Sequence, residues 1–240
     1  VRLNARLAPE LYIDVVAVTD GADGPRIGGP GPAAEYAVRM HRFDRTQELD
    51  RLLCDRALPD TRIDELARQI ARFHAGVARA TADDPWGHPD TVLANARANF
   101  AHAAALEHAP EIAARLATLL DWTVGEHARL APLLAQRKRD GQVREGHGDL
   151  HLANMVVHRG RVTVFDCIEF NPALRWNDVL SEIAFTMMDL RHRGRSDLAQ
   201  RFLNDYLEDT GDFGGLAALP WFLVYRAMVR AKIAAIRAAQ

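Results

Sequence analysis

Residues 147 to 154 read His147-Gly148-Asp149-Leu150-His151-Leu152-Ala153-Asn154 and lead directly into a predicted β-hairpin. Two short apolar runs, 155–157 and 162–165, flank a turn that contains Gly160, which is typical of two antiparallel strands. Asn154 and Asp166 are equally far from Gly160 in the sequence, so we expect them to lie opposite each other, about 5 Å apart at Cα. An amide oxygen and a carboxylate that converge from two strands form a site suited to Mg²⁺.

Asp149 lies five residues before Asn154, on the loop that leads into this hairpin. We expect its side chain to project toward the same point. An aspartate beside a magnesium site can orient a hydroxyl group and accept its proton. The pattern therefore predicts a centre for phosphoryl transfer, with Asp149 as the base.

The spacing of Asp149 and Asn154 resembles the catalytic loop of protein-kinase-like enzymes. Its form, His-Gly-Asp-Leu-His-x-x-Asn, is similar to that of aminoglycoside phosphotransferases and choline-kinase-like enzymes. The resemblance implies that Asp149 is the catalytic base, that Asn154 and Asp166 hold Mg²⁺, and that ATP or GTP is the co-substrate. It also implies three supports of the catalytic loop, namely His147, His151 and Asp178.

A longer string, from Phe165 to Trp176, reads Phe-Asp-Cys-Ile-Glu-Phe-Asn-Pro-Ala-Leu-Arg-Trp. It resembles bacterial proteins in which a phosphotransferase-like domain precedes a P-loop ATPase domain, so a fused C-terminal domain of that kind is an expected partner. The implied fold is a protein-kinase-like α+β fold, with a truncated N-lobe over residues 1–43 and a mainly helical C-lobe over 44–240. The backbone of Met40, His41, Arg42 and Phe43 would then contact the nucleotide at the hinge.

The lack of an early lysine departs from this pattern, because such kinases use a lysine on an N-lobe strand to hold the α- and β-phosphates. No lysine precedes Lys138, and no Gly-x-x-x-x-Gly-Lys motif occurs. In the resemblance, Val1 corresponds to a point beyond that lysine. We therefore expect the first N-lobe strands to be missing here, and this chain alone to be inactive as a kinase. The loop from Gly28 to Pro32 is interpreted as a solvent loop, since its two prolines lack the N–H donors of a phosphate cradle.

The composition further limits the partners and the compartment that we expect for this protein. Thirty basic and 32 acidic residues give a formal charge of -2, which offers no argument for nucleic-acid or membrane partners. No apolar run is long enough for a membrane span. Cys54 and Cys167 are the two cysteines, too few for a disulfide framework, and a reduced cytoplasmic protein is the expectation.

The molecule that accepts the phosphoryl group is the feature that the sequence determines least. Arg226, Arg230 and Arg237 share one face of a predicted helix over 216–238, with Lys232 on another face, and no acidic residue occurs from 216 to 240. This stripe is a solvated face, a docking surface for another domain, or the border of an acceptor site for a neutral or anionic metabolite. Glu169, next to the catalytic hairpin, is a further residue expected on the acceptor side.

The function predicted is phosphoryl transfer from ATP to a hydroxyl group of a small molecule. A first alternative is a catalytically idle regulatory or binding module of a larger protein with a fused ATPase domain. A remote alternative is a metallophosphoesterase, because His147, Asp149 and His151 could bind a transition metal. The downstream Asp-rich and Asn-His motifs of that class are not found in the sequence.

Overall fold

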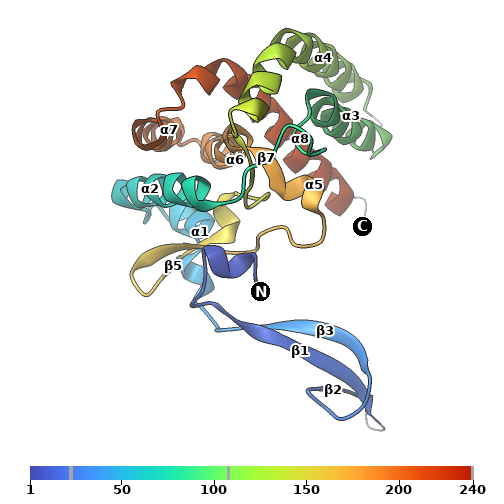
Figure 1. Cartoon of the computed structure of the whole chain (residues 1–240), viewed down its shortest axis with the longest axis vertical. Coiled ribbons are helices and arrows are strands. Elements are labelled where there is room, and N and C mark those ends of the chain that lie inside the picture. Colours follow the sequence, from blue (N-terminus) through green and yellow to red (C-terminus); the bar gives the residue numbers. More distant parts are fainter. Residues whose placement is uncertain (22–23, 107–108, 239–240) are drawn as a thin grey trace. The chain divides into compact units, whose positions relative to one another are not determined.

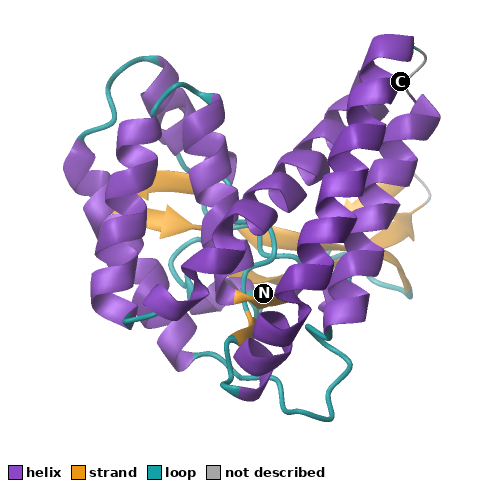
Figure 2. Ribbon diagram, turned by 90° about the horizontal axis from the view of Figure 1, so that it is seen from above, coloured by secondary structure: helices purple, strands orange, loops and turns teal. Residues whose placement is uncertain are grey.

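The computed structural model describes residues 1–21, 24–106 and 109–238. The chain divides into two compact units, one formed by Val1–Leu58 with Ala153–Cys167 and the other by Pro59–Leu152 with Ile168–Gln240. Longer strands belong to the first unit and long helices to the second (Figures 1 and 2). This is the α+β, protein-kinase-like arrangement predicted from the sequence, with a small strand-rich part and a helical part. The first unit extends past residue 43 and includes the catalytic hairpin.

The sheet of the first unit has three antiparallel strands in the order β2-β1-β3, formed by β1 (Tyr12–Gly21), β2 (Gly24–Ile27) and β3 (Ala33–Met40). The β-branched, apolar run 11–18 and the alternating run 35–40 predict two strands, and these form most of β1 and β3. The glycines and prolines of 21–32 predict a loop, but residues 24–27 form a strand that pairs with the end of β1 (Val18 opposite Ile27). An edge position tolerates the proline in this short strand. Residues 22 and 23 of that loop lie outside the described residues.

The core of the first unit gathers around the hairpin of β5 (Met155–His158) and β6 (Arg161–Val164). Buried Ala8, Leu11, Tyr12 and Val156 pack together, and Phe43 and Phe165 are among the half-buried residues packed against them. Short helices complete the unit: η1 (Asn4–Arg6), η2 (Arg45–Gln47) and α1 (Leu49–Cys54).

The second unit consists mainly of six long helices: α2 (Asp60–Gly76), α3 (Pro89–Leu106), α4 (Pro110–Arg139), α6 (Val179–His192), α7 (Ser196–Thr210) and α8 (Leu219–Ala238). Shorter elements are α5 (Pro172–Arg175), η4 (Phe213–Ala218) and the strand pair β4 (Val143–Glu145) and β7 (Trp176–Asp178), while η3 (Leu152–Asn154) spans the boundary with the first unit. The sequence pattern predicts helices over 110–137, 176–192, 195–209 and 216–238. These agree with α4, α6, α7 and α8 within a few residues, except that 176–178 forms a strand. None of the helices in the described ranges is long and apolar enough to cross a membrane.

Helix α6 is buried along most of its length, from Val179 to Met187 and again at Asp189 and Leu190. It packs against both α7 and α8. A helix buried on all sides normally carries apolar residues. The buried polar residues of α6 therefore need partners, and three of these residues, Glu182, Thr186 and Asp189, find them in the loop 147–152.

Candidate active site

The hairpin β5–β6 sets the positions of the two predicted metal ligands. Its strands pair Met155 with Val164 and His158 with Arg161, so the turn is the pair Arg159–Gly160, with φ of 50° and 78°. Positive φ at both turn residues is typical of a tight type I′ hairpin. The centre of the hairpin thus lies between residues 159 and 160, not at Gly160. Accordingly, the carbonyl of Asn154 accepts from the N–H of Phe165 at 2.9 Å. The predicted pairing of Asn154 with Asp166 is wrong by one residue, although both lie at the same end of the hairpin.

Asp166 has an unusual backbone, with φ of 63°, in the left-handed region that few residues other than glycine occupy. Two contacts from the beginning of the chain hold this segment. The N–H of Asp166 donates to Tyr12 Oη at 2.9 Å, and the N–H of Cys167 donates to Asn4 Oδ1 at 2.7 Å. Asn4 and Tyr12 were missed from sequence, since nothing local links them to residues more than 150 positions away.

The donors at this end of the hairpin fit a magnesium ion. Asn154 is buried with 6% of its surface exposed, whereas Asp166 is exposed and its carboxylate is accessible. Mg²⁺ is usually bound by one or two protein oxygens together with water and substrate phosphates. One amide oxygen and one accessible carboxylate meet that requirement without an all-protein cage.

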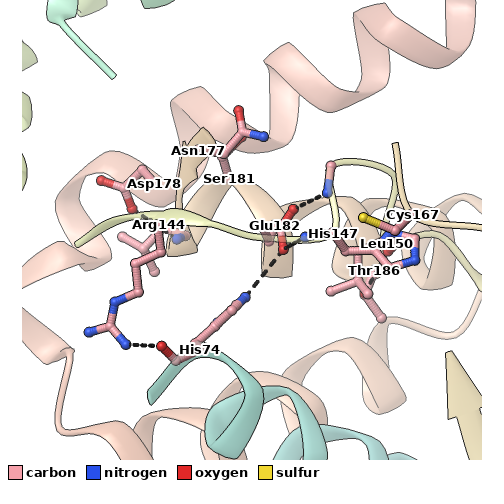
Figure 3. A network of polar contacts seen from close by, with 12 residues as sticks. His74, Arg144, His147, Leu150, Cys167, Asn177, Asp178, Ser181, Glu182 and Thr186 are labelled. Atoms are coloured by element: carbon pink, nitrogen blue, oxygen red, sulfur yellow. Dashed lines mark hydrogen bonds and ion pairs between the residues drawn. The ribbon is translucent and has the colours of Figure 1, made fainter. Parts of the chain in front are cut away.

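Residues 147–152 of the catalytic loop belong to the second unit, and one face of α6 holds their backbone (Figure 3). The Glu182 carboxylate accepts from the N–H groups of His147, at 2.7 Å, and Gly148. Thr186 Oγ1 donates to the carbonyl of Leu150 at 2.8 Å, and Asp189 accepts from the N–H of Leu152 at 3.0 Å. Residues 182, 186 and 189 are spaced by four and three positions, so they lie on one side of the helix. The backbone that carries Asp149 is therefore fixed on both sides of that residue.

Glu182 is the central residue of this arrangement. It is 1% exposed, and its carboxylate also contacts His74 Nε2 at 3.3 Å, while His74 Nδ1 is 2.8 Å from Tyr206 Oη. Burial alone would raise the pKa of Glu182. The hydrogen bond and charge of His74, followed by His147, outweigh this effect and hold the pKa at about 2. Glu182 is therefore ionised at neutral pH inside the protein.

Asp178 has a different role from the one that the resemblance implied. Its carboxylate accepts two hydrogen bonds from Arg137, at 2.7 and 2.8 Å, and caps α6 at the N–H of Leu180. In the described part of the chain, the carboxylates that bind residues 147–152 of the catalytic loop are those of Glu182 and Asp189. The signal for Glu182 was present in the sequence as an acidic residue within a mainly apolar helix.

Asp149 is surrounded by the two histidines expected to support it. Its N–H donates to His147 Nδ1 at 3.3 Å, and its Oδ2 lies 3.3 Å from His151 Nε2. The His151 ring in turn packs edge-on against Phe185, with centroids 5.4 Å apart. Burial tends to raise the pKa of Asp149, but the hydrogen bond and charge of His151, the charge of His147 and that of Arg226 together lower it. The carboxylate is thus available as a proton acceptor at neutral pH.

A cavity of about 560 Å³ in the second unit opens beside Asp149. Arg226 and Arg230, which we expected on the acceptor side, both line it. Glu169 is exposed and is not among its lining residues. Lys232, expected on another face of the helix, also borders the cavity, because its side chain reaches across to Asn99 of α3 at 2.8 Å.

The hinge residues lie in the first unit. Met40, His41, Arg42 and Phe43 border an open hollow of about 780 Å³ together with residues 44–46. The Phe43 ring is 5.0 Å from that of Phe165, the residue before Asp166. The hinge segment and the predicted metal ligands are therefore connected by direct packing inside one unit.

The comparison with known families agrees with this geometry. A model of the phosphotransferase enzyme family matches residues 2–219. The chain belongs to the phosphotransferase enzyme family. Within it, the chain is 30% identical over 241 aligned positions to the uncharacterized protein Rv2004c of Mycobacterium tuberculosis and to the uncharacterized protein Mb2027c of Mycobacterium bovis. Each alignment covers 99% of this chain but only 46% of the relative. The chain therefore spans about half the length of these two proteins.

Proposed function

We propose that the protein transfers a phosphoryl group from ATP, in the presence of Mg²⁺, to a hydroxyl group of a small molecule. The observation that carries this proposal is the fixed catalytic loop. Its backbone is bound by Glu182, Thr186 and Asp189, and the cavity beside it is lined by the carboxylate of Asp149. A preorganised carboxylate beside a cavity is what transfer to a bound hydroxyl requires.

Asp149 acts as the base in this proposal. Its lowered pKa keeps it ionised, so it can accept a hydrogen bond from the acceptor hydroxyl and orient that oxygen for attack. His147 and His151 are positioning residues, because they act through their contacts with Asp149.

Asn154 and Asp166 would hold the magnesium ion, which supplies charge neutralisation for the phosphates when it is bound. The backbone of the segment Met40–Phe43 would receive the adenine. Both assignments rest on the position of these residues in the first unit, where the hollow lined by 40–46 and the end of the β5–β6 hairpin are connected through Phe43 and Phe165.

One observation favours the idle binding module as a second candidate. The sequence has no lysine before Lys138, and Arg39, the basic residue on β3, is paired with Asp14 through two hydrogen bonds at 2.9 and 2.5 Å. A cation that is already paired is a poor anchor for nucleotide phosphates. A binding module of this kind would show no phosphotransferase turnover, so replacing Asp149 would change no activity.

Titration of ATP into the full-length protein, with and without Mg²⁺, tests these assignments. Asp166→Asn keeps a residue that tolerates the left-handed backbone, and we expect it to weaken Mg²⁺-dependent ATP binding by about tenfold or more. Asp149→Asn should leave that affinity within about twofold and lower turnover by about 10²- to 10⁴-fold. The exposed Asp209→Asn serves as the matched control. Equal loss of ATP binding in Asp149→Asn and Asp166→Asn would contradict this division of roles.

A further inference from the structure

The cavity beside Asp149 is strongly cationic. Among the described residues that line it, four are basic and one is acidic, namely Asp149; the basic residues are Arg226, Arg230, Lys232 and Arg237. With histidine neutral, four positive charges and one negative charge leave a balance of +3 for these lining residues. Its other walls include the apolar and aromatic side chains of Ile168, Phe170, Phe185, Tyr225, Val229 and Ile233. A concave site of this composition attracts anions and repels cations.

Arg226 is buried, and none of the described carboxylates forms an ion pair with it. It is 4% exposed, and its guanidinium donates to neutral groups: the carbonyl and hydroxyl of Ser181, at 3.0 and 3.1 Å, and the carbonyl of Gly148, at 3.1 Å. Its Cζ lies 4.9 Å from the centre of the Phe185 ring, and its Nη2 has no hydrogen-bond partner. These contacts fix the direction of the side chain but give it no ion pair, although its charge acts on Asp149 and helps to lower the pKa of that carboxylate.

Arg137 shows how the same fold treats a buried arginine that has only a structural role. Its guanidinium is paired with two carboxylates, those of Asp178 and Asp212, at 2.6 to 2.8 Å. In the described ranges, no carboxylate pairs in this way with Arg226, Arg230, Lys232 or Arg237. An unpaired buried charge is costly, so Arg226 indicates a negative charge supplied from outside, which the half-buried Arg230 and Lys232 and the exposed Arg237 would also attract.

The helix spacing limits the size of that ligand. Arg226 binds the residue before Asp149, and Arg230 follows one turn along α8, about 6 Å further by the rise of a helix. Arg237 is about 16 Å from Arg226 by the same measure. A molecule with a hydroxyl at Asp149 and an anionic group near Arg226 and Arg230 would therefore need a length of only a few carbon atoms.

We propose that the acceptor is a small hydroxylated anion, a polyhydroxy acid or a phosphorylated polyol. This proposal rests on the proposed function. The acceptor oxygen attacks the γ-phosphorus of ATP and forms a new O–P bond. The bond from the γ-phosphorus to the bridging oxygen breaks and ADP leaves. The hydroxyl proton passes to Asp149, while Arg226 and Arg230 hold the anionic group of the acceptor.

Binding can be measured without nucleotide, by calorimetry on the full-length protein with matched pairs of compounds. Gluconate is compared with glucitol, and glycerol 3-phosphate with glycerol, so that each pair differs in its anionic group. We expect at least one anion to bind about tenfold or more tightly than its neutral counterpart, with an affinity that falls as salt is added. Arg230→Gln should remove most of this preference, whereas Arg191→Gln, an exposed arginine at the end of α6, should leave it unchanged.

Several results would overturn the inference. One is that neither anion binds more tightly than its neutral counterpart, and another is that a polycation such as kanamycin binds more tightly than the anions. A third is that Arg230→Gln weakens the binding of ATP instead of the binding of the anion. The outcome is separable from that of the proposed function. Anion binding that persists in a protein whose turnover does not depend on Asp149 would refute the catalytic role and leave the ligand class intact.

Discussion

Replacing Glu182 by glutamine should both destabilise the protein and loosen its catalytic loop. The carboxylate accepts from two backbone N–H groups, those of His147 and Gly148, and contacts His74. A glutamine side chain has a single acceptor oxygen, and its amino group would face the other donor. One buried N–H would then lose its partner, at a cost of about 1–3 kcal/mol.

The lowered pKa of Glu182 gives an independent estimate of how much its ionised carboxylate stabilises the folded protein. Its decrease from the ordinary value of 4.5 to about 2 corresponds to about 3 kcal/mol in favour of the ionised form in the folded protein. Because the folded-state pKa is below the unfolded one, this contribution is present above pH 4.5 and is lost as the pH falls toward 2. We therefore expect Glu182→Gln to lower the free energy of unfolding by about 2–4 kcal/mol at pH 7. The difference from wild type should shrink progressively below about pH 5.

Urea unfolding at a series of pH values measures this effect, with the exposed Glu208→Gln on α7 as control. Hydrogen exchange at the amides of His147 and Gly148 supplies a local measurement, and exchange there should become faster in Glu182→Gln. The reasoning would be refuted by a change below about 0.5 kcal/mol, the usual size of a surface substitution, that does not vary with pH.

Three other predictions follow from the site. Arg137→Gln should lower the free energy of unfolding in urea by about 3–5 kcal/mol, since it leaves the carboxylates of Asp178 and Asp212 without their partner. The control is Arg129→Gln at an exposed arginine, which should lower it by less than about 1 kcal/mol. The acidic limb of the turnover–pH profile attributed to Asp149 should lie below the ordinary aspartate range, because the pKa of this residue is lowered; a limb near neutrality that vanishes in Asp149→Asn would disprove the assignment. Aminoglycosides should be poor substrates of the full-length protein because the cavity is cationic, and resistance to kanamycin in a host that expresses it would show the opposite.

The catalytic loop and hairpin could be predicted from the sequence because their signals are local. The apolar runs around Gly160 fixed the two strands, and the spacing of Asp149, Asn154 and Asp166 indicated the chemistry. The error of one residue in the register arose because the turn uses two residues with positive φ, Arg159 and Gly160. A non-glycine residue such as Arg159 gives no signal for that conformation.

The supports of the site could not be predicted in the same way, since they come from residues distant in sequence. Glu182 reaches the loop from 34 and 35 positions away, and Tyr12 reaches Asp166 from 154. Asp178 was assigned to the loop from the resemblance, but the packing of α4 gives it Arg137 as its partner. The positive charge of the cavity beside Asp149 was visible in the sequence as an arginine stripe, while the participation of Lys232 depended on the position of α3.

Phosphoryl transfer itself is the most direct test of the account. The full-length protein, wild type or Asp149→Asn, is incubated with Mg²⁺, ATP labelled at the γ-phosphate and a set of hydroxylated anions with their neutral counterparts. The account predicts a phosphate ester formed on an anionic acceptor by the wild type, and about 10²-fold or more less product with Asp149→Asn. Equal product from the two proteins, or no transfer to any acceptor while ATP is bound, would contradict it.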